Sequence, residues 1–136
     1  LQSYIEEHQI TDFSPKSIRE MVTEIRWSKL PKPEEMASSG SFFKNVYLDD
    51  TEADRLRGMN VPVWEGNKVP SGWLIDHAGL KGMVFHGMRV SEKAALILIN
   101  ESAQSYAHLK QAREEIVSII KKKYGLTLQQ EPVELE

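Results

Sequence analysis

The sequence predicts an α+β fold in which helices pack on a small, mostly antiparallel or mixed sheet. Residues 105–124 carry apolar side chains at three- and four-residue spacing, which indicates a long amphipathic helix. Residues 94–99 form a continuous apolar run, which suits a strand covered on both faces better than so short a helix. Residues 83–85 and 88–90, separated by a His-Gly pair, are two shorter strand candidates.

For the N-terminal part of the chain, the sequence predicts one helix between two extended or irregular segments. Residues 4–13 form a short extended or irregular entry that acidic residues interrupt. Ser14 and Pro15 then start a helix that runs to about Trp27, because serine caps helices and proline favours the first helical position. Residues 29–33, Lys-Leu-Pro-Lys-Pro, form a stiff extended connector, since each proline lacks an amide donor and restrains the residue before it.

The middle of the chain alternates extended segments with a short helix. A small-residue turn at residues 37–40 leads into a strand over residues 41–48. Asp49 caps a helix that ends near Gly58. An extended segment and a turn then occupy residues 61–68.

Two further helices end at glycines. Residues 70–72, Pro-Ser-Gly, open a helix that Gly79 closes in the left-handed conformation. Ser105 caps the longest helix and Gly125 ends it. Residues 126–128 alternate like a final strand, and an acidic tail follows.

The composition excludes several classes of function. The 136 residues suffice for one domain with a hydrophobic core, and the start at Leu1 rather than methionine leads us to expect a domain cut from a longer protein. The net charge of −3 is unlike the basic surfaces of nucleic-acid-binding proteins, and the longest apolar run is too short to cross a membrane. Cysteine is absent and the four histidines share no ligand spacing, so no metal is expected. These features are compatible with a cytoplasmic location.

The stretch Gly-Ser-Phe-Phe-Lys-Asn at residues 40–45 concentrates polar groups beside two aromatic rings. On a strand, Ser41, Phe43 and Asn45 would face one way and the intervening residues the other. One interpretation is a half-buried strand that happens to begin with serine. The other is a serine presented beside an asparagine and a lysine for an anionic or carbonyl-bearing ligand.

Other polar candidates are less distinctive on their own. Lys81 projects from between two glycines at a helix exit, although a solvated lysine after a helix cap is the simpler interpretation. Lys29 and Glu131 are by default exposed residues of a connector and a tail. Ser41 lacks the glycine-flanked turn of a nucleophile, which argues against a serine hydrolase. No glycine-rich loop opens a helix after a strand, so a self-contained nucleotide-binding domain is not expected.

Taken together, the motifs resemble the C-terminal, substrate-binding domain of the UDP-N-acetylenolpyruvoylglucosamine reductase family, and the resemblance covers the whole chain. Its most specific part is the Ser-Phe-Phe-Lys-Asn motif followed in order by Trp-Leu-Ile-Asp and Leu-Lys-Gly. The motifs that carry the resemblance are Lys29-Leu30-Pro31 with Pro33, Gly40-Ser41-Phe42-Phe43-Lys44-Asn45, Gly72-Trp73-Leu74-Ile75-Asp76, Gly79-Leu80-Lys81-Gly82, Val90-Ser91, Ala95-Leu96-Ile97-Leu98-Ile99-Asn100, Tyr124-Gly125-Leu126 and residues 128–131.

The resemblance implies a flavoenzyme of peptidoglycan precursor synthesis. In the family, NADPH reduces FAD, and the flavin passes a hydride to the enolpyruvyl double bond of UDP-N-acetylglucosamine enolpyruvate, which gives UDP-N-acetylmuramate. The flavin lies in preceding domains. Residues 1–136 would therefore be the substrate domain, would bind no FAD, NADPH or metal alone, and would be inactive as an isolated fragment.

The resemblance also assigns roles to particular residues. Ser41 would be the general acid that protonates the carbanion-like intermediate, a role that demands close geometry because serine is a very weak acid. Glu131 would lie at the substrate carboxylate, where its protonated form could hydrogen-bond the developing enolate. Contacts with the UDP-sugar are implied for four further residues: Tyr4, Lys29, Asn45 and Lys81.

Three positions depart from the family pattern. Val46 replaces a proline after the asparagine, and Ala94 replaces a glutamine or histidine that touches the ligand. Pro132 follows Glu131 in place of valine and could tilt the glutamate or remove a backbone donor. An alternative function is a UDP-sugar-binding or interaction module without reductase activity.

Overall fold

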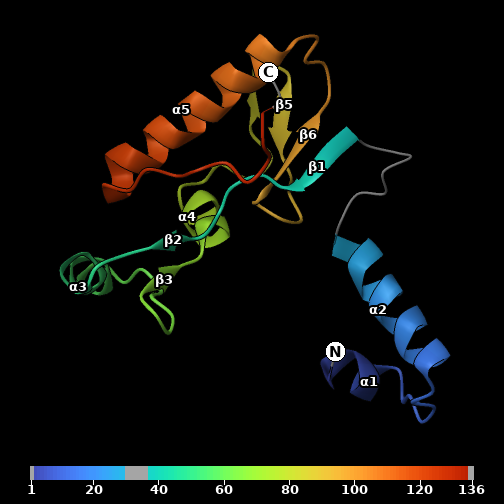
Figure 1. The fold of residues 1–136 in the computed structure, drawn as a ribbon. Coiled ribbons are helices and arrows are strands. Elements are labelled where there is room, and N and C mark those ends of the chain that lie inside the picture. The colour runs from blue at the N-terminus through green and yellow to red at the C-terminus, as the bar shows by residue number, and fades with distance from the viewer. Residues whose placement is uncertain (1, 30–36, 135–136) are drawn as a thin grey trace. The chain divides into compact units, whose positions relative to one another are not determined.

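The computed structural model of the chain describes residues 2–29 and 37–134. The chain divides into two compact units, Leu1–Glu35 and Met36–Glu136. The C-terminal unit contains all the described strands and the three helices α3, α4 and α5 (Figure 1).

The N-terminal unit contains helices α1 (Gln2–Glu7) and α2 (Pro15–Lys29). The predicted start of α2 is confirmed, because the Ser14 Oγ accepts a hydrogen bond from the Ser17 N–H at 3.3 Å. Lys29 is helical, so its assignment to an extended connector was wrong. The proline at position 31 restricts the residue directly before it, which is residue 30 and not Lys29. The connector residues 30–33 lie outside the described part of the chain.

The irregular or extended entry predicted for residues 4–13 was wrong for residues 4–7, which belong to α1, whereas residues 8–13 are irregular. The Tyr4 ring stacks on His8 one turn later, with ring centroids 3.9 Å apart. The Tyr4 hydroxyl also donates a hydrogen bond to the Glu24 carboxylate of α2. These contacts stabilise a short helix that has little apolar periodicity in its sequence.

A four-stranded antiparallel sheet forms part of the C-terminal unit, in the order β1-β6-β5-β4 (Figure 1). Its strands are β1 (Ala37–Ser41), β4 (Val84–Phe85), β5 (Met88–Val90) and β6 (Ile97–Asn100). In the register of the sheet, Ser38 lies opposite Ile99, and Val90 lies opposite Leu98. The predicted α+β class and the strand pair around the His-Gly turn are confirmed.

The single strand predicted over residues 41–48 is divided into two. β1 ends at Ser41, and β2 (Val46–Tyr47) pairs with β3 (Lys68–Val69) in a separate two-stranded sheet. The turn predicted at residues 37–40 was wrong, because these small residues form the edge strand β1. The register of β1 shifts between Ser38 and Ser41, which accommodates a bulge rather than a chain reversal.

The two phenylalanines that follow β1 do not alternate between faces. Phe42 and Phe43 are 4% and 1% exposed, and their rings form an edge-to-face pair with centroids 5.1 Å apart. The predicted alternation was wrong because regular strand geometry ends at Ser41. Both rings enter the core, while Ser41 and Lys44 on either side remain exposed.

The three helices of this unit start and end near the predicted residues. Asp49 caps α3, since its Oδ1 accepts a hydrogen bond from the Glu52 N–H at 2.8 Å. Gly79 and Gly125, after α4 and α5, have φ of 78° and 77°, as left-handed helix ends require. Ser105 stands at the N-cap of α5 but makes no side-chain cap hydrogen bond. The helices are α3 (Asp50–Gly58), α4 (Ser71–His77) and α5 (Tyr106–Tyr124).

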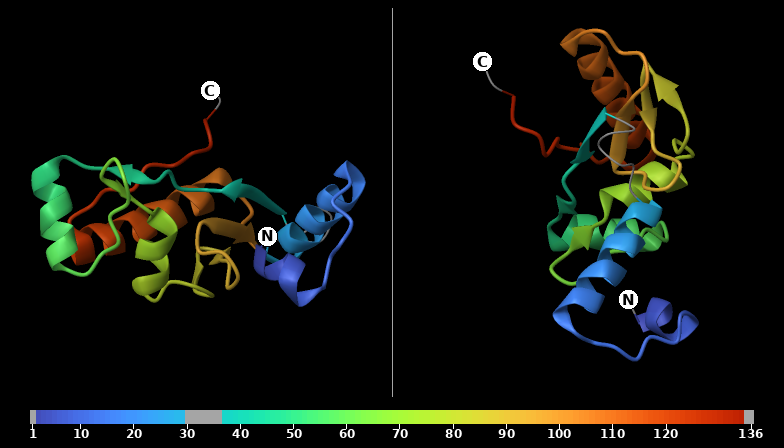
Figure 2. Two further views of the ribbon diagram at one scale, coloured as in Figure 1. Left: turned by 90° about the horizontal axis from the view of Figure 1, so that it is seen from below. Right: turned by 90° about the vertical axis from the view of Figure 1, so that its right-hand side faces the viewer.

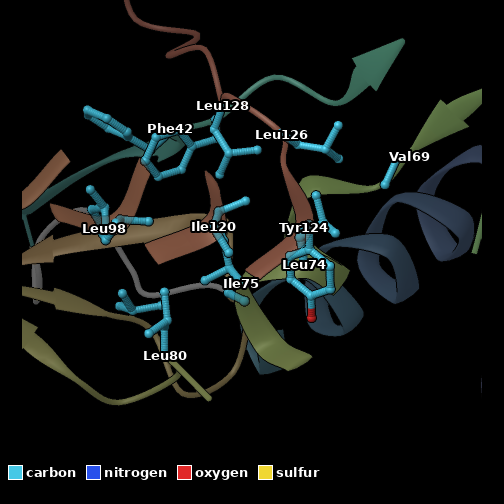
Figure 3. Close-up of a cluster of buried hydrophobic side chains, with 14 of the residues drawn as sticks. Phe42, Val69, Leu74, Ile75, Leu80, Leu98, Ile120, Tyr124, Leu126 and Leu128 are labelled. Atoms are coloured by element: carbon cyan, nitrogen blue, oxygen red, sulfur yellow. The ribbon is translucent and has the colours of Figure 1, made fainter. Parts of the chain in front are cut away.

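The hydrophobic core lies between α5, α4 and the sheet (Figures 1 and 2). α5 buries Ala112, Ile116 and Ile120 of its predicted apolar stripe, together with Tyr124, while Leu109 and Ile119 of that stripe are partly buried against the core. Figure 3 shows Ile120 in one cluster with buried side chains from other elements, namely Phe42, Val69, Leu74, Ile75, Leu80, Leu98, Leu126 and Leu128. Burial of each large side chain contributes roughly 1.5–3 kcal/mol, so the core holds the segments after β1 and α5 in place.

Two predicted strands are shorter or less regular than expected. Residues 97–99 are buried as predicted for a strand covered on both faces, but residues 94–96 form a turn before β6. Residues 126–128 alternate between buried and exposed side chains but form no strand, and among the described residues this part of the chain has one isolated bridge, two residues later, between Gln130 and Phe43. No described helix is long and apolar enough to span a membrane.

The turn between β4 and β5 requires glycine at position 87. Gly87 has φ of 81°, and a Cβ atom there would lie 2.6 Å from the Ala103 nitrogen. The Gly87 carbonyl oxygen accepts hydrogen bonds from the N–H groups of Glu101 and Ser102. The close approach therefore joins this turn to the segment that precedes α5.

Candidate functional site

An open depression of about 490 Å³ lies where the segment after β1 meets the segment after α5. It contains two of the predicted site residues, Asn45 and Glu131, and is called the Asn45–Glu131 depression below. The residues that line it are Lys44, Asn45, Val46, Tyr47, Thr127, Gln129 and Glu131. The fold thus brings together groups that lie at opposite ends of the C-terminal unit in sequence.

Backbone hydrogen bonds fix the two segments side by side. The Lys44 N–H donates to the Gln129 carbonyl oxygen at 2.8 Å, and the Glu131 N–H donates to the Phe42 carbonyl oxygen at 2.8 Å. Pro132 does not remove the donor that holds the glutamate, because that donor belongs to Glu131 itself. Glu131 is therefore not a free tail residue.

Ser41 is the last residue of β1 and is exposed. The next residue, Phe42, donates its N–H to the Leu96 carbonyl oxygen at 2.8 Å and inserts its ring into the core. Ser41 is thereby fixed between the sheet on one side and a buried aromatic anchor on the other. The Glu131 N–H is bonded to the carbonyl oxygen of Phe42, the residue after Ser41, whereas Ser41 is not among the residues that line the depression.

Asn45 has a structural partner as well as a place in the depression. Its Oδ1 accepts a hydrogen bond from the backbone N–H of Ser71, the first residue of α4, at 3.1 Å. The buried Ser71 hydroxyl in turn donates to the Lys44 carbonyl oxygen at 2.5 Å. One end of the Asn45 amide is thus used to orient the side chain, and the NH₂ end has no hydrogen-bond partner among the described residues.

Lys81 lies on the turn after α4 and is outside the set of residues that line the depression. Its Nζ forms an ion pair with the Asp76 carboxylate of α4 at 2.7 Å. Asp76 belongs to the Trp-Leu-Ile-Asp motif, so this ion pair connects two of the sequence motifs. An exposed ion pair of this kind contributes little to stability but restricts where the ammonium group lies.

Tyr4 and Lys29 belong to the N-terminal unit, and their participation in the site stays a prediction. Tyr4 is half-buried, and the hydrogen bond to Glu24 is the main cause that raises the pKa of its hydroxyl. Lys29 is the last residue of α2.

Sequence reasoning missed Thr127 and Gln129 as lining residues. The alternation of residues 126–128 gave the only signal, since it places Thr127 on the exposed side. One departure from the family pattern, Val46, has a local explanation, and the structure gives none for the alanine at position 94. Val46 begins β2 opposite Val69, and the Ala94 N–H donates to the Ser91 hydroxyl at 3.3 Å in the turn before β6.

A second polar group, the Arg113 cluster, lies next to the depression and consists of Tyr106, Arg113, Gln130 and Glu134. Hydrogen bonds from Tyr106, Arg113 and Gln130, in that order of importance, lower the pKa of the Glu134 carboxyl to about 2. The same contact with Glu134 is the main cause that raises the pKa of the Tyr106 hydroxyl. No cluster of metal-binding side chains occurs within residues 2–29 and 37–134.

Comparison with known proteins shows similarity over most of the chain. Residues 32–135 match the family described as UDP-N-acetylenolpyruvoylglucosamine reductase, C-terminal domain. Proteins named UDP-N-acetylenolpyruvoylglucosamine reductase from Alcanivorax borkumensis, Pseudomonas aeruginosa and Shewanella sediminis are 34%, 33% and 35% identical to it. These matches cover 90%, 94% and 90% of this chain but 37%, 40% and 37% of the relatives. The chain thus spans less than half the length of these relatives.

Proposed function

The chain belongs to the family of UDP-N-acetylenolpyruvoylglucosamine reductase C-terminal domains, and we propose that it is the substrate-binding and proton-donating domain of such a reductase. The full-length protein would convert UDP-N-acetylglucosamine enolpyruvate to UDP-N-acetylmuramate with FAD and NADPH. We place this reaction in the cytoplasm, in peptidoglycan synthesis. The proposal rests on the family match together with the shared position of Asn45 and Glu131.

Within the described part of the C-terminal unit, no helix start has the glycine-rich loop that commonly holds the pyrophosphate of a dinucleotide. The helices α3, α4 and α5 begin at Asp49, Pro70 and Ser105, and none of these starts follows a glycine-rich loop. The Asp49 carboxylate already occupies the N-terminus of α3 and would repel a pyrophosphate. We therefore assign both cofactors to another part of the full-length protein, from which the reduced flavin would supply the hydride.

Ser41 is proposed to complete the reduction by donating a proton. Addition of a hydride to one carbon of the enolpyruvyl double bond leaves an electron pair on the carbon that bears the carboxylate. The Ser41 O–H bond then breaks as a C–H bond forms at that carbon, and the serine oxygen regains its proton from solvent. The fixed position of Ser41 between β1 and the Phe42 anchor supports this role, because a weak acid must be held in contact with the basic carbon.

The neighbouring groups are proposed to bind the substrate. Glu131, in its protonated form, would hydrogen-bond the substrate carboxylate as negative charge develops there. The free NH₂ end of Asn45 is suited to a carbonyl or phosphate oxygen of the UDP-sugar. Lys81 and Lys29 would pair with the diphosphate, and Tyr4 would cover the ligand.

The observation that carries the proposal is the backbone pairing that places Glu131 beside the residue after Ser41. The test is an assay of the full-length protein for NADPH oxidation that depends on the enolpyruvyl UDP-sugar, combined with calorimetry of substrate binding. We expect both binding and turnover. Binding without NADPH oxidation would favour a UDP-sugar-binding module, and the absence of both would favour an interaction module.

A further inference from the structure

Residues 130–134 form a closed turn around Glu131. The Gln130 side-chain NH₂ donates to the Pro132 carbonyl oxygen at 3.0 Å and to the Glu134 carboxylate at 2.9 Å. The backbone of Gln130 is paired with Phe43. Glu131 is therefore carried by a short segment whose two ends are joined to each other and whose first residue is joined to the core.

Arg113 of α5 contacts both ends of this turn. Its Nη1 donates hydrogen bonds to the Gln130 side-chain oxygen and to the Glu134 carboxylate. Tyr106, on the same helix, is the largest cause of the low pKa of the Glu134 carboxyl. Because α5 packs on the hydrophobic core and the Arg113 side chain is only partly exposed, Arg113 connects an otherwise exposed segment to the packed part of the unit.

Arg113 is not among the residues that line the Asn45–Glu131 depression. It lines a separate hollow between α5 and residues 128–130, whereas Glu131 lines the Asn45–Glu131 depression. The C-terminal segment thus has α5 on one side and the depression on the other. Any effect of Arg113 on the reaction must pass through this segment.

We propose that Arg113 is a positioning residue that, through Gln130 and Glu134, holds the Glu131 carboxyl in place at the substrate. This inference rests on the proposed function of Glu131. A carboxyl that must meet a developing charge is sensitive to displacements of about 1 Å, which cost on the order of a hundredfold in rate. Loss of the arginine would release the turn, and the hydrogen bond from the Glu131 N–H to the Phe42 carbonyl oxygen would then open more often.

The test uses the full-length protein and the rate at which the enolpyruvyl UDP-sugar reoxidises the pre-reduced flavin. We expect Arg113→Met to slow this step about tenfold or more and Arg113→Lys to restore part of the rate. Glu134→Ala breaks the same contact without altering α5 and should reproduce the loss. Lys110→Met is the matched control, because Lys110 lies on the same helix and pairs only with Glu114, at 4.0 Å, and it should not change the rate.

The decisive comparison is made in a Glu131→Gln background. If Arg113 acts through Glu131, adding Arg113→Met to the Glu131→Gln protein should slow flavin reoxidation by less than about twofold, since the effects of coupled residues are not additive. Equal slowing in both backgrounds, or no slowing by Arg113→Met and Glu134→Ala, overturns the inference while the role of Glu131 stands. No slowing by Glu131→Gln alone overturns that role instead. Hydrogen exchange of the Glu131 amide should also accelerate in Arg113→Met but not in Lys110→Met.

Discussion

The backbone N–H of Glu131 donates a hydrogen bond to the carbonyl oxygen of Phe42 at 2.8 Å. Phe42 follows Ser41 directly. Of the two residues that we propose as catalytic, Glu131 makes this backbone contact itself, and Ser41 is the neighbour of its partner. The Phe42 ring is buried in the core, which prevents this contact from shifting independently of the fold. The relative position of the proposed proton donor and the proposed carboxyl partner is therefore a property of the packed unit.

Ser41→Ala in the full-length protein should abolish turnover of the enolpyruvyl substrate while reduction of the flavin by NADPH persists. The physical reason is that alanine removes the only proton that we assign to the reacting carbon. Stopped-flow measurement of the two half-reactions checks this prediction. Equal loss of both half-reactions would show that the serine has another role. Ser39→Ala, an exposed serine in the same strand, is the control.

Asn45→Ala should lower the free energy of unfolding by about 1 kcal/mol in addition to weakening substrate binding, because it removes the acceptor for the Ser71 N–H at the start of α4. Urea denaturation measures the stability. Thr127→Ala, which lines the same depression without a side-chain hydrogen bond among the described residues, should change stability by less than about 0.5 kcal/mol. A stability loss confined to Thr127→Ala would contradict the assignment of the two roles.

The Glu134 carboxyl should remain ionised well below the usual range for glutamate. Its pKa in the folded protein is lowered to about 2 from 4.5, so its contribution to stability is complete above the higher value and is lost as the pH falls toward the lower one. Carbon-13 NMR titration of the side chain measures this directly. Titration near 4.5 would show that the Arg113 cluster is not formed in solution. The stability difference between the native protein and Glu134→Gln should likewise vanish below pH 2.

Gly87→Ala should destabilise the protein more than Gly66→Ala does. Both glycines have positive φ, of 81° and 72°, so both substitutions cost about 1–2 kcal/mol of backbone strain. Only at Gly87 would the new Cβ meet backbone atoms, 2.6 Å from the Ala103 nitrogen, whereas the space around Gly66 is open. Thermal unfolding of the two variants distinguishes these costs, and equal losses would mean that the turn relaxes away from Ala103.

The purified chain of residues 1–136 should show no flavin absorbance, because its helix starts lack the glycine-rich loop that holds a pyrophosphate. An absorption spectrum between 350 and 500 nm, roughly the range of oxidised flavin, provides the measurement. A yellow protein with one flavin per chain would place the cofactor site in this part of the protein and contradict the assignment above.

The sequence predicted the parts of the fold that depend on local chemistry. The caps at Ser14 and Asp49 and the glycines that end α4 and α5 act within a few residues, so their signals are local. The buried residues of β6 were equally clear. The alternation predicted after Ser41 was wrong because Phe42 and Phe43 are both buried in the core. Whether two adjacent aromatic residues alternate between faces or are both buried depends on tertiary structure.

The candidate site was predictable only in part for the same reason. The polar residues between 41 and 45 were evident from their spacing, but Glu131 looked like an exposed tail residue until resemblance to the family singled it out. The backbone pairing that positions Glu131 joins two irregular segments. Neither segment has a periodic sequence pattern from which its pairing with the other could be predicted. The dual role of Asn45, which caps α4 from another segment, is likewise a long-range contact without a local signal.

The location of residues 127–134 after α5 has a consequence for synthesis on the ribosome. Every described helix and strand is complete once Tyr124 has been added, so the nascent chain already contains the elements of the sheet and its helices. The depression, however, forms only after residues 127–131 have emerged, because three of them line it and they pair with the backbone of Phe42 and Lys44. A chain cut short after Gly125 would lack the buried Leu126 and Leu128 as well as the backbone partners of Phe42 and Phe43, so its core would be incomplete and chaperones and proteases would act on the same molecules that lack the site.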